Sequence, residues 1–311
     1  MYHVRDGVIG LAIGDAMGVP TEGNKREILL AKPVVKMLPK ISAGIPKGAW
    51  SDNTSLSIAT IDAISKSGIN YTAMGDNYVR WFTTNQFCSI NESFGVSNTT
   101  LKSLVRYTQR LEEAYECGSD DYYDNGNDPL CRCLPIAYFF NVKKDTDKKI
   151  LEVVKRVCSI THKHEVAVLG CYIYVRFLMY LLKGINKHSA LNQVRKLDFS
   201  MFNKSSLDEY KRILVADINE FDIDEIKNSS FIVDTLEAAI WCFMKSESFK
   251  ECAIATTNIG GDTPTIGAIA GSLAGIFYGY SNIPKSYLED LRKRDYLIDI
   301  SENYESFLRH M

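Results

Sequence analysis

The sequence lacks an excess of charge of either sign. Its 36 Lys and Arg residues nearly balance 38 Asp and Glu residues over 311 positions, which leaves a formal net charge of -2. A dedicated nucleic-acid surface normally shows clustered, unbalanced Lys and Arg. We therefore expect no nucleic-acid partner, and a small solute as the ligand.

The sequence also lacks a spaced cysteine framework. Only two of its eight cysteines lie close together, in a C-x-C pattern without a second cysteine pair or a nearby histidine, which is a poor zinc signal. We interpret all eight as reduced core or loop thiols of a cytoplasmic protein; they are Cys88, Cys117, Cys131, Cys133, Cys158, Cys171, Cys242 and Cys252.

No pattern predicts export or a membrane span. The first six residues lack a basic start followed by an unbroken apolar region, so we expect no secretory signal. The longest apolar stretch, Val166 to Leu182, carries Arg176 at its middle and is short for a span. We expect this stretch to form a buried helix, and we expect no membrane association.

Sustained period-two alternation is scarce, and there is no internal repeat, low-complexity tract or long linker. Helical patterns dominate instead, so we predict an all-α fold with residues 1–311 in a single large orthogonal helical domain. Beyond the two helices treated next, the patterns predict helices that start after Ser51 and at Met74–Thr84, Thr100–Glu116, Lys149–Ser159, Val166–Lys183, Leu207–Ala216 and Val233–Met244.

Two of the predicted helices carry glycines at intervals of three or four residues. The N-terminal one contains Gly7, Gly10, Gly14 and Gly18, and the C-terminal one contains Gly267, Gly271, Gly275 and Gly279. Such spacing places the glycines on one face, where another helix can approach closely, and glycine costs helix stability unless packing requires it. We predict that the two helices pack together and bring Asp15 and Glu22 near the Asp262 loop.

Four polar segments are candidates for chemistry. They hold carboxylates and hydroxyls at predicted helix starts, which suit a hard cation such as Mg2+, or they hold histidine. The alternatives without a function in chemistry are that the acids and hydroxyls are helix N-caps and that His162 is a hydrogen-bonded structural residue. The segments are Gly14–Glu22, Trp50–Thr54, Thr161–His164 and Gly260–Thr265.

Taken together, these segments resemble motifs of the ADP-ribosylglycohydrolase family, which includes the dinitrogenase-reductase-activating glycohydrolase and the ADP-ribosyl-acceptor hydrolases. The resemblance runs from Gly7 to Pro284. It is carried by Gly14–Glu22 (G-D-x-x-G and a glutamate), Trp50–Thr54 ([ST]-D-D-T), Gly126–Pro135 (G-N-G-[AS]-x-M-R-x-x-P), Thr161–His162 (T-H) and Gly261–Thr265 (G-D-T-D-T).

The resemblance implies hydrolysis of a glycosidic bond between ADP-ribose and a modified side chain, with ADP-ribose or an ADP-ribosylated protein as the partner. It implies two Mg2+ or Mn2+ ions between the second and last motifs. Site residues carried over from it are Glu22 and Asp52 as catalytic, Asp15, Gly126, Asn127 and His162 as substrate-binding, and Ser51, Asp52, Asn53, Asp262 and Thr265 as metal ligands.

The departures from the family pattern fall in the site motifs. Asn53 and Pro264 stand where the family has aspartates, so only Asp52 and Asp262 remain charged in the two metal motifs. Two neighbouring divalent cations would then lack neutralisation, and we expect at most one weakly bound Mg2+ or Mn2+ ion. Asp128 replaces a glycine of the diphosphate loop, and the segment at Phe94 lacks the family's aspartate.

Two hypotheses of different class remain. One is a working ADP-ribosyl hydrolase with a degraded metal site. The other is a catalytically inactive relative that serves as an ADP-ribose-binding or protein-interaction module. The retained Glu22, Asp52, Asp262 and His162 favour the hydrolase, whereas the acceptor side chain, the oligomeric state and the biological partner are left open by the sequence.

Overall fold

The computed structural model describes residues 3–109 and 112–311, and regular structure in these ranges is helical, with no β-strand and three isolated β-bridges. The prediction of an all-α fold is confirmed. The α-helices are α1 Val4–Gly18, α2 Arg26–Ala31, α3 Asp52–Ser67, α4 Tyr71–Thr84, α5 Asn98–Thr108, α6 Leu134–Lys143, α7 Asp147–Cys158, α8 Glu165–Leu182, α9 Lys187–Arg195, α10 Lys204–Glu209, α11 Lys211–Leu214, α12 Ile232–Lys245, α13 Phe249–Thr257, α14 Thr263–Tyr278, α15 Lys285–Asp290 and α16 Arg294–Arg309.

Short 3₁₀ helices occupy several of the connections. They are η1 Val19–Thr21, η2 Ile41–Ala43, η3 Ala114–Glu116, η4 Tyr122–Asp124, η5 Cys131–Cys133, η6 Ile218–Glu220, η7 Ile223–Glu225 and η8 Tyr280–Asn282.

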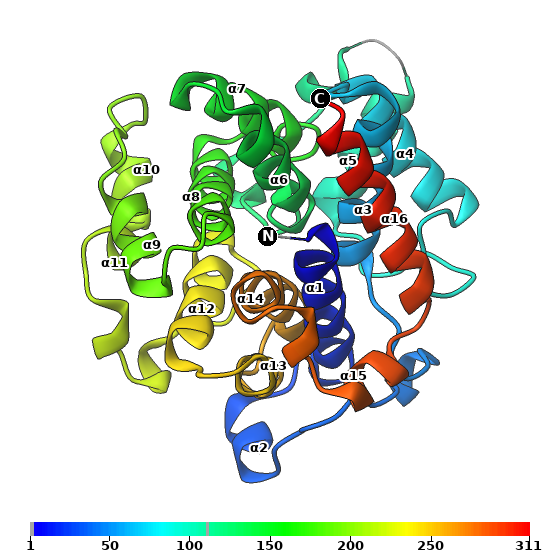
Figure 1. Ribbon diagram of the computed structural model, residues 1–311, viewed down its shortest axis with the longest axis vertical. Coiled ribbons are helices and arrows are strands. Elements are labelled where there is room, and N and C mark those ends of the chain that lie inside the picture. Colours follow the sequence, from blue (N-terminus) through cyan, green and yellow to red (C-terminus); the bar gives the residue numbers. More distant parts are fainter. Residues whose placement is uncertain (1–2, 110–111) are drawn as a thin grey trace.

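The two glycine-lined helices, α1 and α14, lie side by side at the centre of the molecule (Figure 1). They are antiparallel, because a Cβ atom added at Gly10 would overlap the carbonyl of Gly271 and one at Gly14 would overlap that of Gly267. The predicted packing of these helices is confirmed. The C-terminal end of α1 is thereby held against the N-terminal start of α14.

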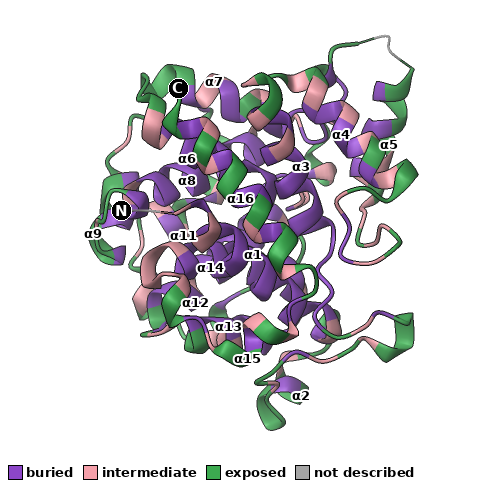
Figure 2. Cartoon of the chain, turned by 45° about the vertical axis from the view of Figure 1, so that its right-hand side comes forward, coloured by how far each residue is buried: buried purple, intermediate pink, exposed green. Residues whose placement is uncertain are grey.

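The central pair is enclosed by other helices. Every residue of α1 except Arg5 and Asp6 is buried, and Figure 2 shows the buried residues of α1, α14 and α8 at the centre, with exposed residues on the outer helices. A helix that is apolar on all sides must be surrounded in this way. Contacts of α1 with α3, α13 and α16 complete the enclosure.

Two predicted helices have the wrong extent. The helix predicted over Thr100–Glu116 ends at Thr108, residues 110–111 lie outside the described residues, and Ala114–Glu116 forms a separate 3₁₀ turn. The helix predicted over Leu207–Ala216 is broken at Tyr210, whose buried hydroxyl donates a hydrogen bond to the Val166 carbonyl. A tertiary contact therefore overrides the local pattern.

Helix α8 has the length and hydropathy of a membrane span, but 89% of its apolar window is buried inside the protein. The interpretation of this stretch as a buried helix is confirmed. The eight cysteines are all free and buried, and burial raises the pKa of the Cys88 thiol to about 11, so that thiol stays protonated at neutral pH.

Replacing Gly14 by Ala tests the contact of α1 with α14. Intrinsic propensity alone predicts a gain of about 1 kcal/mol from this change. The added methyl group would meet the Gly267 backbone, which cannot rotate away, and we expect a net loss of about 3 kcal/mol in the free energy of unfolding. Urea denaturation measures it, and a variant as stable as the parent would contradict the contact.

Candidate active site

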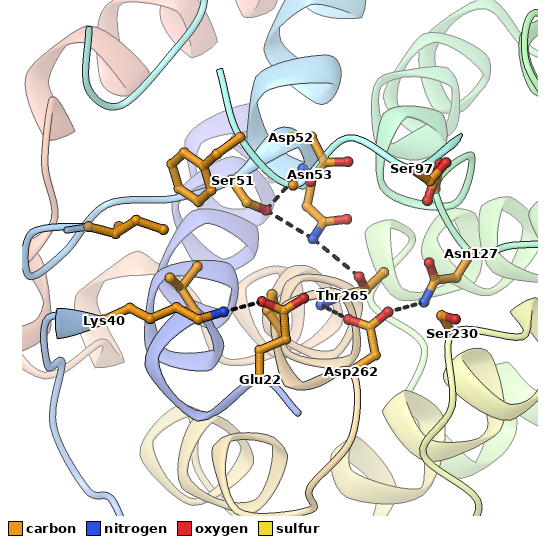
Figure 3. A pocket seen from close by; sticks show the side chains of 16 residues that line it. Glu22, Lys40, Ser51, Asp52, Asn53, Ser97, Asn127, Ser230, Asp262 and Thr265 are labelled. Carbon is orange, nitrogen blue, oxygen red and sulfur yellow. Dashed lines mark hydrogen bonds and ion pairs between the residues drawn. The ribbon is translucent and has the colours of Figure 1, made fainter. Parts of the chain in front are cut away.

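A cleft of about 340 Å³ opens where α1 ends and where α3 and α14 begin (Figure 3). The predicted site residues that line it are Glu22, Ser51, Asp52, Asn53, Asn127, Asp262 and Thr265. The other lining residues are Val19, Lys40, Ile45, Phe94, Gly95, Ser97, Asp128, Ser230 and Pro264. Three residues predicted to bind substrate, Asp15, Gly126 and His162, are not in the lining.

Asp15 lies behind the cleft and holds the start of α3. Its carboxylate accepts hydrogen bonds from the Ser51 backbone N–H (2.9 Å), the Ser51 hydroxyl (2.8 Å) and the Thr54 hydroxyl (2.7 Å). Complete burial raises the pKa of Asp15 to about 6. The carboxylate therefore contacts protein groups of α3, and a direct contact with substrate stays a prediction.

Asp52 is the first residue of α3 and lies against the loop that contains Gly95. Gly95 has a φ of +91°, and a Cβ atom there would overlap the Asp52 carboxylate, with 3.1 Å to its Cγ. Burial, followed by the nearby Asp128 and Asp15 carboxylates, raises the pKa of Asp52 well above its usual range. The protonated form of Asp52 is thus favoured in this site.

Asp262 is the N-cap of α14. One carboxylate oxygen accepts from the Thr265 backbone N–H (3.3 Å), and the other accepts from the Asn127 side-chain amide (2.8 Å). The Gly23 N–H donates to the Gly261 carbonyl at 2.9 Å, which ties the Asp262 loop to the chain after α1. The predicted proximity of Glu22 to the Asp262 loop is confirmed, and burial raises the pKa of Asp262.

The predicted metal ligands are largely hydrogen-bonded to one another. The Asn53 amide donates to Ser51 Oγ (3.2 Å) and to Thr265 Oγ1 (3.3 Å), while both oxygens of Asp262 are already paired. Within residues 3–109 and 112–311, no group of three or more His, Cys, Asp or Glu side chains could hold a metal ion. This donor set does not fit the pair of ions that the resemblance implies.

Lys40 lies at the mouth of the cleft and was not predicted from the sequence. Its ammonium group forms an ion pair with Glu22, with 2.6 Å between Nζ and Oε2 (Figure 3). Paired backbone hydrogen bonds between Lys40 and Ile45 shape this segment before α3. Lys40 and Ser230, which was also missed, carry no local motif, so no sequence signal pointed to them.

Asp128 joins the cleft to the segment before α5. It lines the cleft, and its carboxylate accepts hydrogen bonds from the hydroxyls of Ser97 and of Thr100, the latter at 2.5 Å. These bonds hold the loop that crosses over Asp52. The Asp128 carboxylate therefore faces the cleft. From this position it can repel a phosphate group bound there.

His162 is buried behind Gly126 and Asp128. Thr161 Oγ1 accepts a hydrogen bond from the Arg132 guanidinium and lies 2.6 Å from His162 Nδ1, so a hydrogen bond joins the Thr161 hydroxyl to the imidazole ring. Nε2 has no hydrogen-bond partner among the described residues and lies 4.0 Å from Asp128 Oδ2. A Cβ atom at Gly126 would lie 3.2 Å from Nε2.

The pH dependence of stability tests the buried state of His162. Burial lowers its pKa from 6.5 to about 4, so the unfolded chain binds the proton first as the pH falls. The stabilisation from neutral His162 is present above pH 6.5 and is lost as the pH falls toward about 4, by about 3 kcal/mol in total. His162→Gln removes this dependence, as measured by urea denaturation between the two pH values.

The exposed His188 on α9 provides the control, since His188→Gln leaves the acid dependence of the parent chain in place. An acid dependence as steep in His162→Gln as in the parent would contradict the buried neutral histidine.

Gly95→Ala tests the contact between Gly95 and Asp52. The change imposes backbone strain of roughly 1–2 kcal/mol at positive φ and drives a methyl group into the carboxylate. Gly184 is the matched control, because its φ is +77° and nothing lies within 4 Å of an added Cβ atom. We expect unfolding experiments to show a loss for Gly95→Ala at least about 1 kcal/mol larger than for Gly184→Ala; equal losses would contradict the contact.

Comparison with known proteins places the chain in context. The model of a family described as ADP-ribosylglycohydrolase matches residues 2–310. The ADP-ribosylarginine hydrolase Tri1 of Serratia proteamaculans is 27% identical over 305 residues, which cover 96% of this chain and 77% of the relative. The ADP-ribosyl-[dinitrogen reductase] glycohydrolase of Rhodospirillum rubrum is 25% identical over 295 residues, with 91% and 88% covered.

A solved structure, titled ADP-ribosylglycohydrolase-related protein complex, matches with a TM-score of 0.82 and 24% identity over 98% of both chains. This likeness establishes that the two proteins share their fold.

Proposed function

The chain belongs to the ADP-ribosylglycohydrolase family, and from this premise we propose that it is a hydrolase that cleaves the glycosidic bond between ADP-ribose and a modified protein side chain. The observation that carries the proposal is the convergence of Glu22, Asp52 and Asp262 on one cleft. These carboxylates come from three segments that are far apart in the sequence.

Cleavage at the anomeric carbon of the ribose passes through a state with oxocarbenium character, and two carboxyl groups with different roles suit it. Glu22, at the open mouth, takes a proton from the attacking water. Asp52, whose pKa burial raises well above the usual range, gives a proton to the departing side chain. Water thus adds to the anomeric carbon as the bond to the acceptor breaks.

The remaining residues bind the ligand in this proposal. Asn127 faces the ligand directly, while Gly126 and His162 support it from behind, and Asp15 positions Ser51 at the start of α3. When the ligand enters, Lys40 breaks its ion pair with Glu22 and contacts the diphosphate. Lys40 is suited to this because it carries the positive charge among the described lining residues.

We propose that at most one Mg2+ or Mn2+ ion binds in the cleft, too weakly to occupy the site of the parent chain at millimolar concentration. Its candidate ligands are oxygens of Ser51, Asp52, Asn53, Asp262 and Thr265. Two observations support the low number. Most of these atoms already have hydrogen-bond partners within the protein, and Pro264 offers no ligand atom. No step above depends on an ion.

Turnover of ADP-ribosylated peptides tests the proposal. ADP-ribosylarginine peptide is the first substrate, because the Serratia relative is named for it, and ADP-ribosylserine peptide is the second, each with Mg2+, Mn2+ or a chelator. We expect hydrolysis by the parent chain and a loss of roughly 100-fold or more in kcat for Glu22→Gln. Glu27→Gln, an exposed neighbour on α2, is the matched control.

Binding of ADP-ribose without turnover of either peptide would reject the hydrolase. That result would instead support the inactive ADP-ribose-binding module. The uncharged Asn53 and Pro264 are compatible with such a module, because they argue against a full metal centre.

A further inference from the structure

We propose that the side-chain amide of Asn53 bridges the starts of α3 and α14, so that the cleft assembles without a divalent cation. The proposal deepens the proposed function, because it rests on this cleft being the ligand site. The family resemblance marks Asn53 only as an uncharged metal ligand. The proposal assigns it a positioning role as a hydrogen-bond donor.

The direction of the hydrogen bonds follows from the neighbours of Asn53. The Ser51 hydroxyl donates its only proton to Asp15 Oδ1, at 2.8 Å, so Ser51 Oγ can only accept from Asn53. The NH2 group of Asn53 must therefore face Ser51, and it reaches Thr265 Oγ1 on α14 at 3.3 Å (Figure 3). Two oxygens from two helix starts thus share one donor group.

A cation at this point would bind to the same two oxygens. The resemblance assigns Ser51 Oγ and Thr265 Oγ1 to a metal, and in the structure both accept from the neutral Asn53 amide instead. Both hydrogens of the amide are used, so the group presents only its positive end to these oxygens. The neutral amide joins the two oxygens without the carboxylates that would be needed to neutralise a divalent cation.

A second amide occupies the other side of the predicted metal site. Asn127 Nδ2 donates to Asp262 Oδ2 at 2.8 Å and to Thr235 Oγ1 at 2.7 Å. The other oxygen of Asp262 accepts from the Thr265 backbone N–H. Each oxygen of Asp262 thus already accepts one hydrogen bond from the protein, which reduces its capacity to bind an ion.

Asn53→Asp reverses the chemistry at the bridge. It replaces the donor by an acceptor, removes the hydrogen bond to Ser51 Oγ and adds a negative charge near Asp52 and Asp262, so repulsion destabilises the site until a cation binds. We expect the melting temperature of the parent to be the same in chelator, Mg2+ or Mn2+. We expect that of Asn53→Asp to fall by roughly 5 °C in chelator and to recover in millimolar Mg2+ or Mn2+.

Two control variants separate the bridge from general effects. Asn53→Ala loses the bridge without gaining a ligand, so its lowered melting temperature must not recover with either cation. Asn186→Asp adds the same charge at the exposed N-cap of α9, where an aspartate still caps the helix, and its melting temperature must show no cation dependence.

Titration calorimetry of the parent chain with Mg2+ and Mn2+ is the second measurement, and it needs no variant to fold. Stoichiometric binding by the parent, a cation-dependent rise in its melting temperature, or an Asn53→Asp variant indifferent to cations would each overturn the proposal. These readouts do not involve turnover. Failure of the peptide assay therefore rejects the proposed hydrolase and leaves the evidence for the Asn53 bridge unchanged.

Discussion

The site depends on the close backbone contact between α1 and α14. Because Gly10 and Gly14 present no side chain to Gly271 and Gly267, the two helices approach until their backbones touch. The contact continues to the ends of the helices, where the Thr263 hydroxyl donates to the carbonyl of Gly18 at 2.9 Å. An additional methyl group along this line would separate the carboxylates that the two ends carry.

The cleft brings together the carboxylates of Glu22, Asp52, Asp128 and Asp262, and their mutual repulsion must be offset. The compensation visible in the structure comes from neutral donors and one lysine. Asn127 donates to Asp262, hydroxyls donate to Asp128, Lys40 pairs with Glu22, and burial favours the protonated form of Asp52. The uncharged Asn53 and Pro264 reduce the same repulsion, since each replaces a family aspartate.

Much of the fold was predictable because its signals are local. Glycine spacing in α1 and α14 and the apolar run of α8 depend only on the period of the helix, and both interpretations are confirmed. Helix ends were less predictable. The chain breaks at Tyr210 because its hydroxyl reaches the carbonyl of Val166, a partner 44 residues away that no local window contains.

The sequence by itself determined the all-helical class, the pairing of the glycine helices and the residue types at their ends, since these follow from periodicity and composition. Only the tertiary structure decided which of those residues face the cleft. It placed Lys40 in the lining and His162 behind it, and it turned the Asp15 carboxylate toward α3. It also decided that Asn53 acts as a donor, because the direction of that bond depends on where the Ser51 proton goes.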